Sequence, residues 1–203
     1  MSNNPSPSED KVKDVIRKLE PCREIEGNKK FGIVHPEEGH MLQVLIAISN
    51  ARNVLEIGTS IGVSTLWICL GLLKTGGRIT TIDYYPEHIR LAKENFKRAG
   101  VEDMVTIIEG DALNAIPLLN DKFDFVFSDA NKKQNLIYFN LFMPLIANGG
   151  VIVAHDSITE ADNMFDYLKT IKSHPQLDTV IISTANSPLG LAISHKKLSN
   201  GER

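Results

Sequence analysis

Short apolar runs alternate with segments of helical periodicity along most of the chain. The runs that predict buried strands cover residues 53–58, 78–83, 105–110, 123–129 and 149–156. Each is followed by a segment whose apolar residues recur at helical spacing. Such an alternation is typical of a parallel sheet covered by helices on both faces, and the near-continuous apolar runs agree with burial on both sides. The pattern therefore predicts a doubly wound α/β domain.

The two ends of the chain complete this prediction. Residues 178–184 and 189–196 read as two closing strands that can pair antiparallel, and residues 11–20 and 35–50 read as helices that precede the sheet. The first ten residues are polar and lack periodicity, which indicates a disordered tail. We expect a tail over residues 1–10 and a single domain over residues 11–203.

Ligands of such sheets bind in the crevice at the carboxyl ends of the strands. The loop after the first strand reads G-T-S-I-G-V-S from Gly58 to Ser64 and opens a helix. Its spacing differs from the G-x-G-x-x-G of dinucleotide folds, so a smaller anion such as an amino-acid carboxylate fits better at the helix N-terminus. Alternatively, Gly58 and Gly62 serve only tight packing.

The loops after the second and third strands carry two aspartates. Asp83 lies where a carboxylate accepts hydrogen bonds from ribose hydroxyls, with Tyr84 beside it to wall a pocket. Asp111 and Ala112 lie where an adenine would follow. Each aspartate has a competing interpretation as the N-cap of the next helix.

Composition narrows the possible partners. The net charge is −3, which gives no general attraction for nucleic acid or an anionic membrane. The apolar runs are far shorter than a membrane span, and the N-terminus lacks the features of a secretory signal. A cytoplasmic location is the expectation.

The segments "HPEEGHMLQVL", "VLEIGTSIGVS", "FDFVFSDANK", "NGGVIVAHD" and "GLAISHKK", together with the long segment from Ile79 to Ala112, occur in an order that resembles a known family. The chain is similar to class I S-adenosylmethionine-dependent methyltransferases, and more narrowly to the catechol and caffeoyl-CoA O-methyltransferase branch with its small bacterial relatives. The resemblance implies a Rossmann-like, seven-stranded sheet, mostly parallel with the last strand antiparallel, and an enzyme that uses S-adenosylmethionine.

The resemblance also implies roles for individual residues. Asp129 matches a metal-ligating carboxylate beside the cofactor, and Lys132 matches the lysine that takes the proton from the acceptor hydroxyl. Lys132 as a plain surface lysine, with Lys133 beside it, is the competing interpretation. The implied cofactor-binding residues are Glu56, Gly58, Thr59, Gly62, Ser64, Asp83, Tyr84, Asp111, Ala112 and Asp129, of which Ser64 would contact the methionine carboxylate.

The chain departs from the branch after the fifth strand. The branch has Asp-Asn as metal ligands where this sequence has His155 and Asp156, and a tyrosine where it has Asn135. Tyr138 matches a second tyrosine of the branch. The long loop that follows this strand in the branch is missing, and a helix over 160–171 is expected almost at once.

Three hypotheses remain open for His155 and Asp156. Together with Asp129 they form a metal site, whose nitrogen ligand shifts preference from Mg²⁺ toward Mn²⁺ and later transition metals. Alternatively no metal binds and His155 is the general base, since its ordinary pKa lies near physiological pH. In the third, His155 only hydrogen-bonds at a strand end while Asp156 or Ser157 caps the next helix.

The leading hypothesis is methyl transfer from S-adenosylmethionine to a hydroxyl of a small, aromatic or vicinal-diol acceptor, assisted by Mg²⁺ or Mn²⁺. The alternatives are methylation of a tRNA hydroxyuridine, a metal-independent reaction with His155 as base, and a cofactor-binding protein with a degraded site. A homodimer is expected from the resemblance.

Overall fold

The computed structural model describes residues 7–23 and 31–198. Residues 1–6 of the predicted tail lie outside the described residues. Helix α1 (Glu9–Leu19) begins inside that tail, because the Ser8 side chain accepts a hydrogen bond from the backbone N–H of Lys11 and caps the helix. The tail prediction for residues 9 and 10 is therefore wrong.

A seven-stranded sheet with the strand order β3-β2-β1-β4-β5-β7-β6 forms the centre of the molecule. Strand β7 is antiparallel to both of its neighbours, and the other strands run parallel. This confirms the predicted Rossmann-like sheet. The strands are β1 (Asn53–Ile57), β2 (Arg78–Asp83), β3 (Val105–Glu109), β4 (Phe123–Ser128), β5 (Ile146–His155), β6 (Leu177–Thr184) and β7 (Ser187–Lys196).

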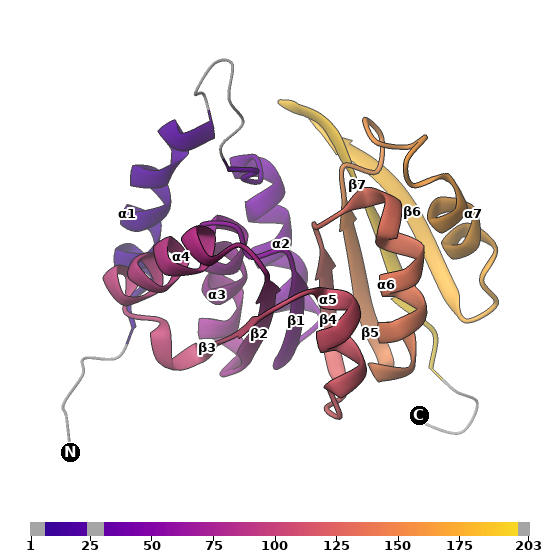
Figure 1. Ribbon diagram of the computed structural model, residues 1–203, viewed down its shortest axis with the longest axis horizontal. Helices are drawn as coiled ribbons and strands as arrows, with labels where there is room; N and C mark the ends of the chain where they lie inside the picture. The colour runs from indigo at the N-terminus through magenta and orange to yellow at the C-terminus, as the bar shows by residue number, and fades with distance from the viewer. Residues whose placement is uncertain (1–6, 24–30, 199–203) are drawn as a thin grey trace.

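Helices cover both faces of the sheet (Figure 1). One face carries α1, α2 (Pro36–Ile48), α3 (Val63–Thr75) and α4 (Pro86–Ala99), and the other carries α5 (Ala112–Ala115), α6 (Asn135–Phe142) and α7 (Phe165–Ser173). Short 3-10 turns complete the chain at Glu20–Arg23, Glu102–Met104, Ile116–Leu118, Lys132–Gln134 and Met143–Leu145. Among the described residues, every helix is too short or too polar to cross a lipid bilayer.

Side chains alternate between the two cores along each central strand. In β4, Phe125 and Phe127 pack with α1–α4, whereas Val126 packs with α5–α7. In β5, Val153 faces the α1–α4 side and Ala154 the other. Because successive side chains point to opposite faces, His155 lies on the α1–α4 side of the sheet.

Adjacent strand ends bring separate parts of the chain together. Ser128 of β4 pairs with Ala154 of β5 in a parallel register. Asp129 and His155, each one residue further along, therefore emerge side by side.

The segment between β5 and α7 differs from the prediction, since α7 begins at Phe165 rather than at residue 160. The backbone N–H groups of Ser157 and Ile158 donate to the carbonyls of Gly190 and Leu189, so the chain is still bound to β7 after β5 ends. Residues 157–164 form turns instead of a helix.

Candidate active site

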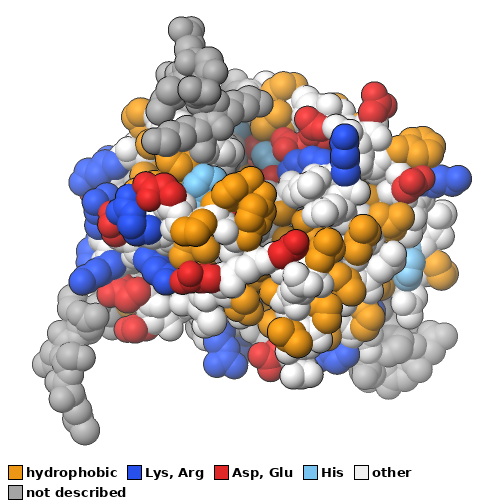
Figure 2. Space-filling view, in the orientation of Figure 1, with side chains coloured by type: hydrophobic (Ala, Val, Ile, Leu, Met, Phe, Trp, Pro, Cys, Tyr) orange, Lys and Arg blue, Asp and Glu red, His pale blue; other side chains and the backbone are white. Residues whose placement is uncertain are grey.

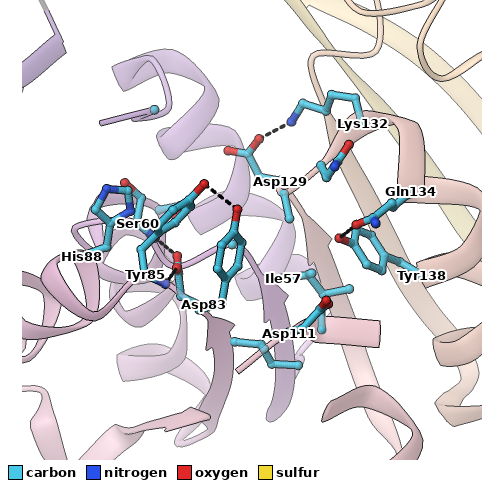
Figure 3. A pocket seen from close by; sticks show the side chains of 18 of the residues that line it. Ile57, Ser60, Asp83, Tyr85, His88, Asp111, Asp129, Lys132, Gln134 and Tyr138 are labelled. Carbon is cyan, nitrogen blue, oxygen red and sulfur yellow. Dashed lines mark hydrogen bonds and ion pairs between the residues drawn. The ribbon is translucent and has the colours of Figure 1, made fainter. Parts of the chain in front are cut away.

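A cavity of about 650 Å³ opens at the carboxyl ends of β1, β2, β4 and β5, where the strand order reverses between β1 and β4 (Figure 3). This is the position at which open α/β sheets bind ligands. Figure 2 shows a hollow near the top of that view in which acidic, basic and histidine side chains gather. Of the residues singled out from the sequence, Gly58, Ser64, Asp83, Tyr84, Asp111, Ala112, Asp129, Lys132 and Asp156 line the cavity.

Glu56 lies beneath the first loop rather than in the cavity. Its fully buried carboxylate accepts hydrogen bonds from Ser64 Oγ at 2.6 Å, Thr65 Oγ1 at 2.5 Å and Thr81 Oγ1 at 2.7 Å. Burial raises the pKa of Glu56 to about 7, although the three hydroxyls work in the opposite direction. Glu56 therefore anchors the loop, and the Ser64 hydroxyl donates to this carboxylate.

Thr59 belongs to the same buried network, since its Oγ1 lies 2.6 Å from Thr81 Oγ1. Neither Glu56 nor Thr59 is among the residues that line the cavity. Both side chains are thus buried in the network that anchors the loop Gly58–Ser64.

The two glycines of the loop serve close packing. Gly58 has φ of +100°, and a Cβ there would lie 2.5 Å from the carbonyl oxygen of Asp129. Gly62 has φ of +88°, and a Cβ there would lie 2.5 Å from the ring of Phe96. Both glycines therefore permit tight packing, and Gly58 also lines the cavity.

Asp83 presents its carboxylate at the mouth of the cavity. It accepts hydrogen bonds from the backbone N–H groups of Ser60 at 2.7 Å and Tyr85 at 2.9 Å. The N-cap of α4 is Tyr85, and it lacks a side-chain cap bond. The capping interpretation of Asp83 is therefore wrong, and both oxygens keep lone pairs for a ligand.

Asp111 does cap a helix, because its Oδ1 accepts from Leu113 N at 2.9 Å at the start of α5. It lines the cavity as well, so capping and ligand contact are compatible here. Tyr84 stands nearby with its hydroxyl 2.5 Å from that of Tyr85. This bond raises the pKa of Tyr84 to about 12.

Several cavity residues were missed in the sequence analysis. Ser60 has φ of +47°, and its Oγ is buried without a hydrogen-bond partner among the described residues. Gln134 also lines the cavity, and its Oε1 accepts a hydrogen bond at 2.5 Å from the hydroxyl of Tyr138, a residue that the resemblance had already marked. Ser60 could have been found from its place between Gly58 and Gly62, whereas Gln134 follows no pattern that marks it.

Lys132 lies at the other end of the cavity from Asp83 (Figure 3). Its Nζ is 2.5 Å from Asp129 Oδ1 and 3.0 Å from Asp156 Oδ2, and its side chain is 13% exposed. Burial opposes the charged form, but Asp129 and Asp156 outweigh it and raise the pKa of Lys132. Lys132 is therefore an ammonium ion inside the site, and the surface-lysine interpretation is wrong.

His155 is buried between three carboxylates. Its Nδ1 lies 3.1 Å from Asp129 Oδ1 and 3.4 Å from Asp156 Oδ1, and its Nε2 lies 2.8 Å from Glu38 Oε2. Burial disfavours the imidazolium, but Asp129 and the other two carboxylates outweigh it and raise the pKa of His155 to about 10. A histidine that is protonated at neutral pH does not accept a proton, so this geometry counts against the general-base hypothesis.

The capping hypothesis for this segment is wrong. The N-cap of α7 is Met164. Ser157 Oγ donates to the Ala154 carbonyl at 2.7 Å and accepts from Ala192 N at 3.0 Å, which ties the end of β5 to β7. Asp156 adopts φ of +58° and points to Lys132 instead of the helix.

Asp129, His155 and Asp156 fit a divalent cation. One ligand atom from each lies within 4.8 Å of the others, and Nδ1 of His155 can serve as a ligand once a cation displaces its proton. Burial raises the pKa of Asp129, but His155 and Lys132 outweigh it and hold that pKa well below its usual value. The two carboxylates and one imidazole are donors for which Mn²⁺ and related ions are suited.

The comparisons with known proteins agree with this geometry. The model of the O-methyltransferase family matches residues 13–183. A catechol O-methyltransferase of Mycobacterium tuberculosis is 37% identical over 163 residues, which cover 74% of this chain and 74% of that protein. A catechol O-methyltransferase of Niastella koreensis is 37% identical over 131 residues, but these span only 59% of its length and 63% of this chain.

Solved structures share the whole fold. The O-methyltransferase of Bacillus cereus, crystallised in complex with SAH, is 27% identical with a TM-score of 0.79, over 97% of this chain and 94% of that one. A Staphylococcus aureus protein that is provisionally described as a caffeoyl-CoA O-methyltransferase is 29% identical, with a TM-score of 0.77. The match covers 89% of this chain and 91% of that one.

Proposed function

Because this chain belongs to the O-methyltransferase family, we propose that it transfers a methyl group from S-adenosylmethionine to a hydroxyl group of a small acceptor. The observation that carries the proposal is the cavity itself. One end offers the Asp83 carboxylate, and the other holds Lys132 between Asp129 and Asp156. This reaction requires a group that accepts hydrogen bonds from the cofactor's ribose at one end of the cavity. At the other end it requires a charged group that binds the hydroxyl of the substrate.

The chain's own residues would hold the cofactor along the cavity. Asp83 would accept hydrogen bonds from the two ribose hydroxyls, and Asp111 and Ala112 would border the adenine. The unpartnered Ser60 hydroxyl and the loop at Gly58 would face the methionine part. The positive end of helix α3, which begins at Val63, favours its carboxylate.

Lys132 is the residue that we propose to contact the acceptor oxygen. As an ammonium ion it lowers the pKa of a hydroxyl beside it, since a nearby opposite charge favours the ionised oxygen. It accepts the hydroxyl proton only after it has lost its own. Methyl transfer then needs the oxyanion held in line with the sulfonium, which is an orientation task for the cavity walls.

Asp129, His155 through Nδ1, and Asp156 would hold a divalent cation, with Mn²⁺ preferred over Mg²⁺ because of the imidazole. Such an ion supplies positive charge to an acceptor oxyanion. Asp129 and Asp156 also hold Lys132 in this structure. The ammonium group therefore competes with the ion for the same two carboxylates.

An aromatic or vicinal-diol acceptor fits the edge of the cavity. The rings of Tyr84 and Tyr85 lie 4.0 Å apart, and Tyr85 lies 5.0 Å from His88. All three line the cavity beside Asp83, and their tilted rings would add aromatic surface to its wall. Figure 2 shows hydrophobic side chains along the lower edge of the hollow.

The test combines binding and turnover. We expect calorimetry to detect the binding of S-adenosylhomocysteine to the protein. We also expect the protein to methylate catechol and caffeoyl-CoA in a reaction that Mn²⁺ stimulates and EDTA suppresses. Turnover that is unchanged by EDTA would contradict the proposal that the reaction depends on a divalent cation. Methylation of full-length tRNA that carries a hydroxyuridine, but of no catechol, would favour the nucleic-acid alternative. Binding of that tRNA should then weaken steeply as the salt concentration rises. Cofactor binding without any turnover would favour a degraded site.

Two expectations about the surroundings of the protein stay predictions. A homodimer would be tested by sedimentation of the purified chain. A cytoplasmic location would be tested by fractionation of the cells that make it.

A further inference from the structure

A buried carboxylate outside the cavity lining contacts the candidate metal site from behind. Glu38, in the first turn of α2, is fully buried. Its Oε2 lies 2.8 Å from His155 Nε2, although 117 residues separate the two along the chain. The contact forms because His155 lies on the face of the sheet that α2 covers.

Both oxygens of Glu38 are fixed by further donors. Oε2 also accepts from the backbone N–H of His35 at 2.9 Å, and Oε1 accepts from Ser187 Oγ at 2.7 Å. The carboxylate therefore has one orientation, set by α2 itself and by the start of β7. A carboxylate held in this way is a rigid acceptor for the imidazole N–H.

The position of Glu38 decides which nitrogen of His155 faces the cavity. An imidazole has two nitrogens, and a hydrogen bond to one of them fixes the ring so that the other is presented elsewhere. Here Nε2 points to Glu38, and Nδ1 points to Asp129 and Asp156. This is the arrangement of a metal-binding histidine with an outer carboxylate.

We propose that Glu38 is a positioning residue that holds the ring of His155 with Nδ1 toward Asp129 and Asp156, and so completes the cation site. The proposal rests on the proposed function for the identity of the site. No spacing in the sequence links Glu38 to His155, because Glu38 lies in a helix before the first strand of the sheet.

A purely structural role for Glu38 makes a different prediction. Glu38 anchors α2 to β7 through Ser187, and its neighbour Glu37 anchors the same helix turn to the same region by accepting from Asn186 N at 3.1 Å. Of the two glutamates, only Glu38 contacts His155 in the structure. Glu37→Gln therefore serves as the matched control, since it loosens the anchor without touching the Glu38 carboxylate or its bond to Nε2.

The experiment has two readouts. Calorimetric titration of the metal-free full chain with MnCl₂ should show binding roughly 10- to 100-fold weaker for Glu38→Gln than for the wild type, and near wild type for Glu37→Gln. Nitrogen-15 NMR of histidine-labelled, metal-free protein, with Glu38→Gln and His155→Gln compared for assignment, should show that Glu38→Gln alters the Nε2 signal of His155. Glu38→Asp, which keeps the charge but withdraws it by one methylene, should weaken Mn²⁺ binding by an intermediate factor.

Mn²⁺ affinities that fall equally in Glu38→Gln and Glu37→Gln would overturn the proposal, as would an unchanged His155 signal in Glu38→Gln. If Glu38→Gln does not fold, Glu38→Asp decides by the same comparison. A wild type that binds no Mn²⁺ would refute the metal in the proposed function. The same result would overturn the role of Glu38 in completing a cation site. An altered Nε2 signal in Glu38→Gln would then show that the Glu38–His155 contact exists even though the cation site does not.

Discussion

Lys132 Nζ lies 2.5 Å from Asp129 Oδ1, and only three residues separate them. The short 3-10 turn at Lys132–Gln134 folds the lysine back over the end of β4, whereas the next residue, Lys133, is exposed. Two adjacent lysines thus have opposite surroundings.

Replacing Lys132 with Met should lower kcat by roughly 100-fold or more, since a positioned proton-transfer or charge-stabilising group contributes about that factor. Lys133→Met should stay within about twofold of the wild type. Steady-state kinetics with a catechol acceptor measures both, with S-adenosylmethionine saturating. An equal fall in kcat in the two variants would show that Lys132 contributes no more to catalysis than the exposed Lys133.

Replacing Asp83 with Asn should weaken binding of S-adenosylhomocysteine by roughly 10- to 100-fold, since hydrogen bonds to a charged group are worth about 1.5–3 kcal/mol. The amide of Asn also turns its NH₂ group toward one of the two backbone donors, Ser60 N–H or Tyr85 N–H, which then loses its acceptor. Glu109→Gln is the control, because Glu109 pairs with Asp83 across β2 and β3 but forms only an exposed ion pair with Lys93. Calorimetry should find the control unchanged, and an unaffected Asp83→Asn would remove Asp83 from the cofactor site.

Gly58→Ala should destabilise the fold and disturb the site together. The added Cβ would lie 2.5 Å from the Asp129 carbonyl oxygen, at a φ of +100°. Overpacking and left-handed strain together cost about 2–5 kcal/mol. Gly76→Ala shares the positive φ, at +73°, but has nothing within 4 Å, so it should cost only about 1–2 kcal/mol. Urea unfolding of both variants gives the difference, and equal losses would mean that the contact with Asp129 does not matter.

Glu56 should make stability fall as pH rises. Its folded pKa of about 7 lies above the ordinary value of 4.5, so the native state keeps a proton that the unfolded chain has lost between these two values. Its contribution is complete below about pH 4.5 and lost by about pH 7, a change on the order of 3 kcal/mol. The difference in unfolding free energy between wild type and Glu56→Gln, measured from pH 4.5 to 8, should follow this slope. A difference that is constant with pH would show that Glu56 does not titrate there.

Local patterns predicted most of the fold and one part of the site. The strands and the residues that follow them could be located because apolar periodicity and glycine spacing are properties of short segments. Asp83, Asp129, Lys132 and Asp156 reach the cavity for that reason. The start of α7 was misplaced because hydrogen bonds to β7, which lies further along the chain, hold residues 157 and 158 in turns.

Contacts between distant segments account for what the sequence did not reveal. Glu38 reaches His155 from helix α2, which precedes the sheet in the sequence. Three carboxylates around one imidazole shift the pKa of His155 away from the range of a base. The buried network around Glu56 likewise joins separate segments, because the hydroxyls of Thr65 and Thr81 both donate to its carboxylate.

The position of β7 between β5 and β6 has a consequence for biosynthesis. Strand β5 bears His155 and has β7 as its partner on one side, yet β7 begins 32 positions after His155, at Ser187. A nascent chain therefore leaves that edge of β5 open until residues 187–196 have left the ribosome. An unpaired apolar edge strand invites pairing with other chains. Ribosomes that stall before this point should release products that aggregate, and those products would lack the Ser187 hydroxyl that holds Glu38.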